Sequence, residues 1–156
     1  MEFYLKDSKA TEKLGFLLGK AAFDGAVFCL TGELGAGKTL LAGGMAVALG
    51  VTDAVTSPTF TLLNIYEGAR LELRHFDLYR LNRSEELDDI GFDEYAGGEG
   101  VTVIEWADLF KERLPEAYLS VDLRREGEGR RAVISAVGPG YAELMEEVAQ
   151  HADFSA

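Results

Sequence analysis

The residues most suited to chemistry form one continuous segment, residues 32–39, which reads Gly-Glu-Leu-Gly-Ala-Gly-Lys-Thr and matches the phosphate-binding pattern G-x-x-x-x-G-K-[ST] completely. Glycines let the backbone curl until successive N–H groups point at phosphate oxygens. Lys38 supplies a positive charge for the outer phosphates, and the Thr39 hydroxyl is placed to ligate Mg²⁺. These residue types at this spacing predict a nucleoside triphosphate site.

The segments on either side of this loop are the ones such a site needs. The apolar run 26–30 precedes the loop and predicts a buried strand. Residues 38–49 carry helix formers with apolar residues at helical spacing, and Gly50 follows as a stop. The single cysteine, Cys29, lies within the predicted strand, so we expect a small buried side chain and no internal disulfide.

A triphosphate site also needs an acid for its metal, and two predicted strands end in one. Asp77 follows the apolar-rich segment 70–76, and Glu105 follows residues 101–104. Carboxylates at such strand ends can hold Mg²⁺ or orient water. The sequence leaves both as candidates for the Walker B acid.

A second group of polar residues lies between the loop helix and the first acid. Four hydroxyl side chains surround Pro58, namely Thr56, Ser57, Thr59 and Thr61. They could contact Mg²⁺ in a loop that the γ-phosphate orders, or they could form only a capped turn. Trp106, next to Glu105, is either a core or lid aromatic or part of a switch that responds to nucleotide.

Other candidates have simpler explanations. We interpret His75 as a packed strand residue, and we find no nucleophile–histidine–acid arrangement. Four arginines flank a predicted hairpin turn, namely Arg124, Arg125, Arg130 and Arg131. A solvated charged tip is the default interpretation, and one arginine reaching a nucleotide or a partner is the alternative.

The remaining pattern predicts the architecture. We expect a helix capped by Ser8 and running to about Phe23, hairpins over 59–77 and 119–137, a short acidic helix over 84–90, and a final helix from Pro139-Gly140 to about Gln150. Alternating strands and helices with two hairpins indicate a three-layer α/β P-loop fold with a mixed parallel and antiparallel sheet. We expect one domain over residues 1–156.

The composition limits the partners. The chain has 27 acidic and 15 basic residues, a net charge of −12, which opposes unaided binding to a nucleic acid backbone. Any role on RNA should therefore need a partner protein. The chain start lacks the layout of a secretion signal, and no stretch approaches the roughly 20 apolar residues of a membrane span. We expect a cytoplasmic protein with no membrane contact.

Four motifs in order carry a family resemblance. They are the loop at 32–39, Ser57-Pro58-Thr59-Phe60-Thr61-Leu62, His75-Phe76-Asp77-Leu78-Tyr79-Arg80 and Ile104-Glu105-Trp106. With them the chain resembles the TsaE (YjeE) family over nearly its whole length. That resemblance implies an ATPase required to make N6-threonylcarbamoyladenosine at position 37 of tRNAs that read codons beginning with A. The transfer chemistry would belong to its partners, the TsaD and TsaB proteins.

The resemblance also implies roles for particular residues. Lys38, Asp77 and Glu105 would be catalytic, with Thr39 and Glu105 as Mg²⁺ ligands and Asp77 orienting water or the metal shell. The nucleotide would contact Glu33, Leu34, Gly35, Ala36, Gly37, Lys38, Thr39 and Leu40, with Thr11 and Arg130 outside the loop. Ser57, Pro58, Thr59 and Thr61 would resemble one switch segment, and Trp106 a second.

Three alternatives remain open. A small-molecule or nucleoside kinase shares the loop and the fold, although the sequence offers no clear acceptor site. A GTPase-like switch lacks support because no Asn-Lys-x-Asp motif occurs in the chain. A scaffold that keeps a nucleotide for stability is the third. We expect slow hydrolysis by the isolated chain, since no arginine finger lies in the loop or in the switch segments.

Overall fold

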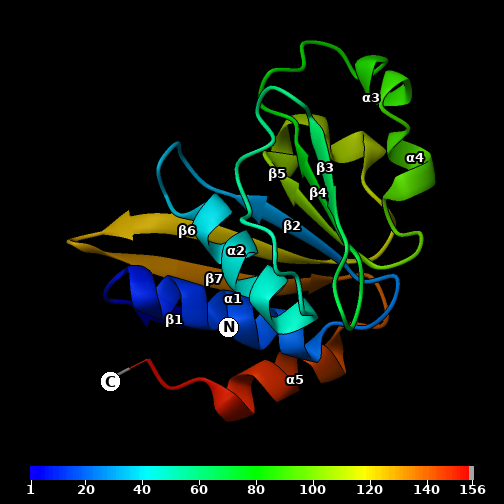
Figure 1. Ribbon diagram of the computed structural model, residues 1–156. Coiled ribbons are helices and arrows are strands. Elements are labelled where there is room, and N and C mark those ends of the chain that lie inside the picture. The colour runs from blue at the N-terminus through cyan, green and yellow to red at the C-terminus, as the bar shows by residue number, and fades with distance from the viewer. Residues whose placement is uncertain (155–156) are drawn as a thin grey trace.

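The computed structural model describes residues 1–154 and is built on one seven-stranded sheet (Figure 1). Its strands are β1 (Glu2–Leu5), β2 (Val27–Thr31), β3 (Leu63–Tyr66), β4 (Leu73–Asp77), β5 (Val101–Glu105), β6 (Tyr118–Glu126) and β7 (Gly129–Val137). Their order across the sheet is β1-β7-β6-β2-β5-β4-β3. The pairs β2–β5, β2–β6 and β4–β5 are parallel, and the pairs at either side are antiparallel. The predicted mixed sheet is confirmed.

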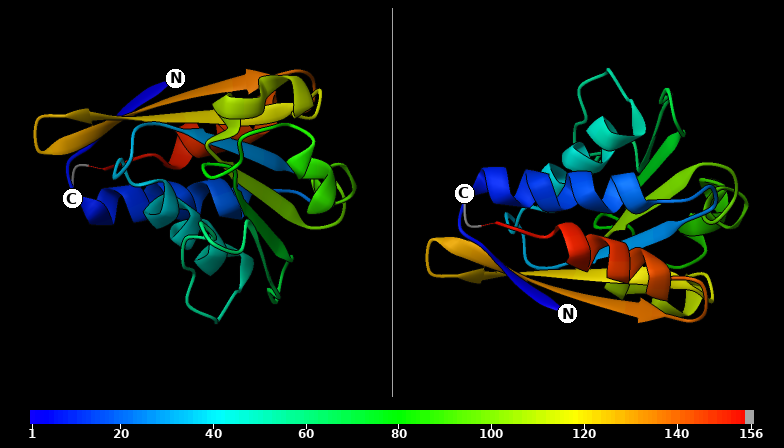
Figure 2. Two further views of the ribbon diagram at one scale, coloured as in Figure 1. Left: turned by 90° about the horizontal axis from the view of Figure 1, so that it is seen from above. Right: turned by 90° about the horizontal axis from the view of Figure 1, so that it is seen from below.

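Helices cover both faces of this sheet and give the three predicted layers (Figure 2). The helices are α1 (Ser8–Ala21), α2 (Lys38–Leu49), α3 (Glu86–Asp89), α4 (Phe92–Tyr95), the 3₁₀ helix η1 (Ala107–Arg113) and α5 (Ala142–His151). Alternate residues of β2 serve the two cores, because strand side chains alternate between faces. Phe28 and Leu30 join the core under α1, α2 and α5, whereas Val27 and Cys29 join the core under α3, α4 and η1. No helix within residues 1–154 has the length and apolar character to cross a membrane.

Three details of the sequence prediction were wrong. The N-cap of α1 is Asp7, whose Oδ1 accepts a hydrogen bond from the Ala10 N–H at 2.9 Å, and Ser8 is already helical. Strand β1 was not predicted, and it pairs antiparallel with β7. The first arm of the 59–77 hairpin begins only at Leu63, so residues 59–62 belong to a turn. That turn carries two of the predicted switch hydroxyls, those of Thr59 and Thr61.

Two long helices, α1 and α2, touch backbone to backbone. A Cβ atom added to Gly15 would lie 2.1 Å from the Leu41 carbonyl oxygen, and one added to Gly44 would lie 2.2 Å from the Glu12 carbonyl oxygen. Gly43, on the neighbouring position of α2, has no heavy atom within 4 Å of such a Cβ. The glycines at the crossing therefore fix where α2 lies, and α2 begins at the phosphate-binding loop.

Cys29 is buried as predicted, with 1% of its surface exposed. Burial raises the pKa of its thiol from 9.0 to about 12. The thiol is therefore protonated in the folded chain at neutral pH, and a protonated, covered thiol is a poor nucleophile. Because the unfolded thiol ionises near pH 9, this group stabilises the fold below pH 9, and that contribution is lost as the pH rises toward 12.

We expect Cys29 in the native protein to react with a thiol reagent such as DTNB at pH 8 at least about 100-fold more slowly than in urea-unfolded protein, since only a minor open population exposes it. The measurement is the rate of absorbance change in each condition. Equal rates would contradict the burial of this side chain.

Candidate functional site

The phosphate-binding loop leaves the end of β2 and runs into the first residue of α2. Gly32, Gly35 and Gly37 have φ angles of +137°, +79° and +108°, a region that residues with a Cβ rarely adopt. A Cβ on Gly32 would also lie 2.4 Å from the Leu123 carbonyl oxygen. The loop conformation therefore requires glycine at these positions, and it turns the backbone around the start of a helix.

Lys38 is folded back onto this loop. Its Nζ donates to the carbonyl oxygens of Gly32 at 2.6 Å and Glu33 at 2.9 Å. The Trp106 ring centroid lies 4.1 Å from the same nitrogen. Burial lowers the pKa of the ammonium, and nearby carboxylates, the nearest in effect being Glu105, partly offset that shift. The charge is thus held inside the loop with little water around it.

The two candidate acids end neighbouring parallel strands, with Asp77 opposite Glu105 in the register. The Thr39 hydroxyl lies 3.3 Å and 3.1 Å from the two carboxylate oxygens of Glu105. Asp77 Oδ2 accepts instead from Ser57 Oγ at 3.2 Å and Thr59 Oγ1 at 3.1 Å. The structure therefore separates two acids that the strand pattern alone left equivalent, since Glu105 contacts Thr39 and Asp77 contacts the hydroxyls beside Pro58.

These groups face one cavity of about 290 Å³. Its lining includes Lys38, Thr39, Ser57, Thr59, Asp77, Tyr79, Glu105 and Trp106. The cavity joins a curled glycine loop, one ammonium group and a hydroxyl beside a carboxylate. Phosphates need the first two, and Mg²⁺ prefers the oxygen ligands of the third. The residues present therefore fit a magnesium–triphosphate group.

Not every predicted switch residue faces this cavity. Thr61 is exposed, and its hydroxyl donates to Asn64 Oδ1 at 2.8 Å. Leu62 and Trp106 have φ angles of 68° and 60°, and within residues 1–154 they are the only non-glycine residues with positive φ. Such conformations cost about 1–3 kcal/mol each and are held by the surrounding structure. Trp106 directly follows Glu105 and lines the cavity, and the Leu62 carbonyl accepts from the Asp77 N–H at 3.0 Å, so each residue with positive φ is next to one of the two acids.

A second cavity, of about 450 Å³, lies on the other side of the loop and is lined by Thr11 and Arg130. Arg130 donates to the Ala36 carbonyl at 3.0 Å and to the Gly35 carbonyl at 3.2 Å. Arg125, from the same hairpin, donates to the Leu34 carbonyl at 3.2 Å. The interpretation of this hairpin as a purely solvated tip was therefore wrong for these two arginines, which hold the loop.

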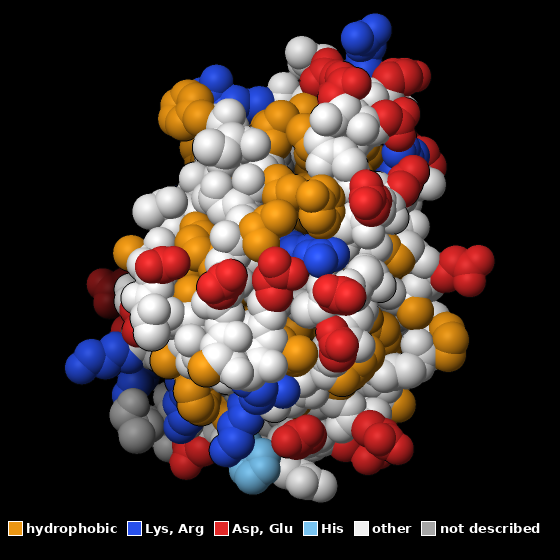
Figure 3. All heavy atoms as spheres, turned by 45° about the vertical axis from the view of Figure 1, so that its right-hand side comes forward, with side chains coloured by type: hydrophobic (Ala, Val, Ile, Leu, Met, Phe, Trp, Pro, Cys, Tyr) orange, Lys and Arg blue, Asp and Glu red, His pale blue; other side chains and the backbone are white. Residues whose placement is uncertain are grey.

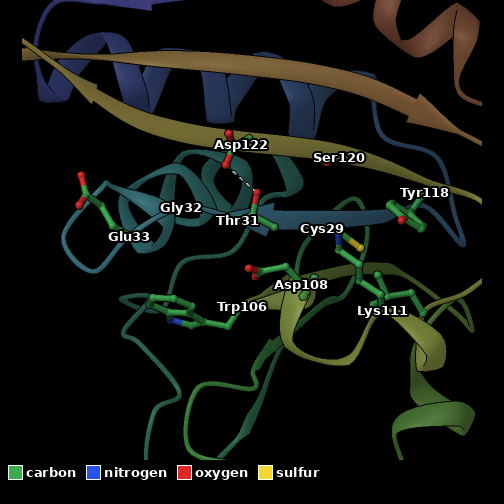
Figure 4. Close-up of a pocket in the computed structure, with 12 residues that line it drawn as sticks. Cys29, Thr31, Gly32, Glu33, Trp106, Asp108, Lys111, Tyr118, Ser120 and Asp122 are labelled. Atoms are coloured by element: carbon green, nitrogen blue, oxygen red, sulfur yellow. Dashed lines mark hydrogen bonds between the residues drawn. The ribbon is translucent and has the colours of Figure 1, made fainter.

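A third cavity was not predicted. It has a volume of about 530 Å³ and lies between the end of β2, η1 and β6 (Figure 4). On one wall, formed by the paired strands β2 and β6, Thr31 donates to Asp122 Oδ1 at 2.8 Å, and Asp108 and Lys111 come from η1. Trp106 lines both this cavity and the one that holds Lys38. Its ring therefore borders both spaces.

His75 is the residue whose contact the sequence analysis missed. It is buried in β4 as expected, yet its Nε2 lies 2.5 Å from Glu105 Oε2. The available signal was its position two residues before Asp77, which places both side chains on one face of the strand. That signal gave no indication of a contact with the neighbouring strand.

The strand, glycine loop and helix, with Lys38, Thr39 and two strand-end acids around one cavity, define a P-loop nucleotide-binding protein. Comparison with known families gives the particular one. The model of a family described as "Threonylcarbamoyl adenosine biosynthesis protein TsaE" matches residues 5–133. The chain belongs to the TsaE family.

Individual relatives agree with this assignment. A Bacillus subtilis protein named tRNA threonylcarbamoyladenosine biosynthesis protein TsaE is 41% identical over 151 residues, covering 96% of this chain and 92% of the relative. A Treponema pallidum protein of the same name is 41% identical over 131 residues, covering 84% and 96%. The crystal structure of Bacillus subtilis YdiB superposes with a TM-score of 0.85 and 36% identity, covering 97% of this chain and 95% of that one.

Proposed function

We propose that this chain is a Mg²⁺-dependent ATPase that serves threonylcarbamoylation of adenosine 37 in tRNAs reading codons that begin with A. The observation that carries the proposal is the cavity in which Lys38, the Thr39–Glu105 pair and Asp77 meet. A nucleotide-binding site of this kind explains the ATPase half of the proposal. Family membership supports the tRNA half.

The residues divide the work as follows. Loop N–H groups and Lys38 would bind the β- and γ-phosphates, whose oxygens would replace the Gly32 and Glu33 carbonyls as acceptors for the lysine. Thr39 and Glu105 would hold Mg²⁺, which when bound neutralises charge on the phosphates. Asp77 would orient the attacking water once Ser57 and Thr59 release its Oδ2.

The rest of the nucleotide has room beside the loop. The 450 Å³ cavity begins at Gly35–Gly37 and extends between Thr11 and Arg130. Adenosine in this cavity would lie on the opposite side of the phosphate-binding loop from Ser57 and Thr59. The loop would then contact both the adenosine and the phosphates of ATP. ATP is preferred to GTP because the chain lacks the Asn-Lys-x-Asp motif that recognises guanine.

Partners complete the proposal. The family resemblance implies that the TsaD–TsaB pair transfers the threonylcarbamoyl group, and that tRNA contacts this chain only through that complex. The face shown in Figure 3 carries acidic side chains spread among apolar groups over most of its area, with several lysines and arginines gathered at its lower left. Within the described part of the chain, no arginine lines the cavity that holds Lys38. A partner side chain that enters there would speed hydrolysis.

The test is ATP turnover by the purified protein with Mg²⁺, alone and with the TsaD–TsaB pair. We expect slow turnover alone and at least about tenfold stimulation by the pair, since an added arginine finger can contribute more than that. Equal turnover in both conditions would contradict the role of partners. No Mg²⁺-dependent hydrolysis in either condition would contradict the ATPase proposal.

A small-molecule kinase is the second candidate, and the 530 Å³ cavity next to Trp106 favours it as a place for an acceptor. Against a kinase, the Trp106 ring packs on Lys38 and borders both cavities, so it lies between an acceptor in the 530 Å³ cavity and the lysine that would bind phosphate. Incubating the protein with ATP labelled on its γ-phosphate and a panel of nucleosides and small hydroxyl compounds distinguishes a kinase from an ATPase. We expect label only in inorganic phosphate.

A further inference from the structure

His75 makes a contact that the proposed mechanism does not use. Its ring is fully buried, and Nε2 lies 2.5 Å from Glu105 Oε2. The other ring nitrogen, Nδ1, is also buried and has no hydrogen-bond partner among residues 1–154. Glu105 is therefore held by two side chains, Thr39 from the loop helix and His75 from the neighbouring strand.

Apart from Glu105, the neighbours of His75 on this side of the sheet include buried apolar residues. Leu73, two residues earlier on the same strand face, is fully buried, and so is Val103, the partner of His75 on β5. The buried Nδ1 without a partner destabilises the fold, and packing with these apolar neighbours needs no imidazole. A leucine at position 75 would fill much of the space, but it would leave the buried Glu105 carboxylate with one donor fewer. The contact with Glu105 is therefore what requires an imidazole here.

The direction of the hydrogen bond follows from the same contacts. A carboxylate can only accept, so Nε2 carries the hydrogen. A second hydrogen on Nδ1 would be a buried N–H without an acceptor. The geometry thus predicts the Nε2–H tautomer. Oε2 of Glu105 is contacted by both His75 and the Thr39 hydroxyl, and Oε1 by the Thr39 hydroxyl at 3.3 Å.

We propose that His75 is a positioning residue that fixes the Glu105 carboxylate, so that this carboxylate and Thr39 are oriented together for Mg²⁺. The inference rests on the proposed Mg²⁺ site. Groups that hydrogen-bond a metal ligand commonly change metal affinity 10–100-fold when removed, because the ligand must otherwise be ordered during binding. The role differs from that of a catalytic residue, since His75 contacts neither phosphate nor water in this scheme.

The test compares His75→Leu with His75→Gln. Glutamine can place an amide N–H near the position of Nε2, whereas leucine cannot donate at all. Leu73→Ala is the matched control, because it disturbs the same face of β4 without removing a contact to Glu105. Calorimetry would give the affinity for a non-hydrolysable ATP analogue in EDTA and the Mg²⁺ concentration that half-saturates its tighter binding. Thermal unfolding without ligand would be recorded for each variant.

We expect His75→Leu to raise the half-saturating Mg²⁺ concentration about tenfold, with affinity in EDTA unchanged. Its unfolding temperature should fall, because the buried Glu105 carboxylate loses a hydrogen-bond donor. His75→Gln should recover most of the Mg²⁺ affinity. Leu73→Ala should lower the unfolding temperature and leave the Mg²⁺ response unaltered. ¹⁵N spectra of the free wild-type protein should show the hydrogen of His75 on Nε2.

Two failures can be told apart. A wild type whose nucleotide binding ignores Mg²⁺ would overturn the metal site and, with it, the role of His75. A wild type that responds, together with an unchanged response in His75→Leu, would overturn only the role of His75. A parallel loss in Leu73→Ala would mean that packing, not positioning, controls the metal response.

Discussion

Lys38→Ala should lower ATP turnover at least about 100-fold, the usual effect of losing one preorganised group that stabilises developing charge. The ammonium is already buried in the loop with two carbonyl acceptors, so phosphates would meet it without much rearrangement of water. Alanine leaves the loop conformation to its glycines but removes that charge. Measuring Mg²⁺-ATP turnover and nucleotide affinity in the same preparation checks this result.

Lys20→Ala is the control, because it removes an exposed lysine from the last turn of α1. It should hydrolyse ATP at the wild-type rate. If Lys38→Ala remains folded but no longer supports tRNA modification with the TsaD–TsaB pair, the nucleotide is not held for stability alone. Wild-type turnover by Lys38→Ala would remove the central element of the proposed mechanism.

Gly44→Ala should destabilise the protein by about 3 kcal/mol, the upper part of the range for overpacking a close contact. The added methyl would lie 2.2 Å from a backbone carbonyl oxygen of α1, and neither backbone can move without separating the two helices. The methyl group of Gly43→Ala, one position earlier, meets open space. This variant should instead be more stable by about 0.5–1 kcal/mol, because alanine loses less backbone entropy than glycine when the helix forms.

Urea unfolding of Gly44→Ala, Gly43→Ala and the wild type gives the three free energies of unfolding. Both variants make the same change, glycine to alanine, at adjacent positions of one helix, so the change in helix propensity is shared and the difference between them reports on the helix crossing. Equal free energies of unfolding for the two variants would mean that α1 and α2 can move apart cheaply.

Sequence alone predicted the parts of the molecule that local rules determine. The bounds of α2, Lys38–Leu49, are those expected from the motif and from Gly50. The central strands and the mixed sheet also follow from short apolar runs and turn residues. The candidate site was predicted as a set of residues because each follows a strand or lies in a motif.

The missing parts depend on contacts between distant segments. Strand β1 has only four residues, and its partner lies near the other end of the chain. The strand pattern alone left Asp77 and Glu105 equivalent, because their different contacts depend on which hydroxyl reaches which strand end; only the family resemblance gave them different roles. The left-handed backbone of Leu62 and Trp106 has no sequence signal, because the surrounding structure imposes it on residues that disfavour it.

The pairing of β2 affects how the protein is made. This strand delivers the phosphate-binding loop, yet both strands beside it, β5 and β6, come from the second half of the chain. Contacts of such long sequence separation form slowly, and a chain is synthesised from its N-terminus. During translation the apolar β2 and the loop leave the ribosome before either neighbouring strand exists. The nascent chain therefore carries an unpaired central strand until most of its length has emerged, and a chaperone should bind it during that interval.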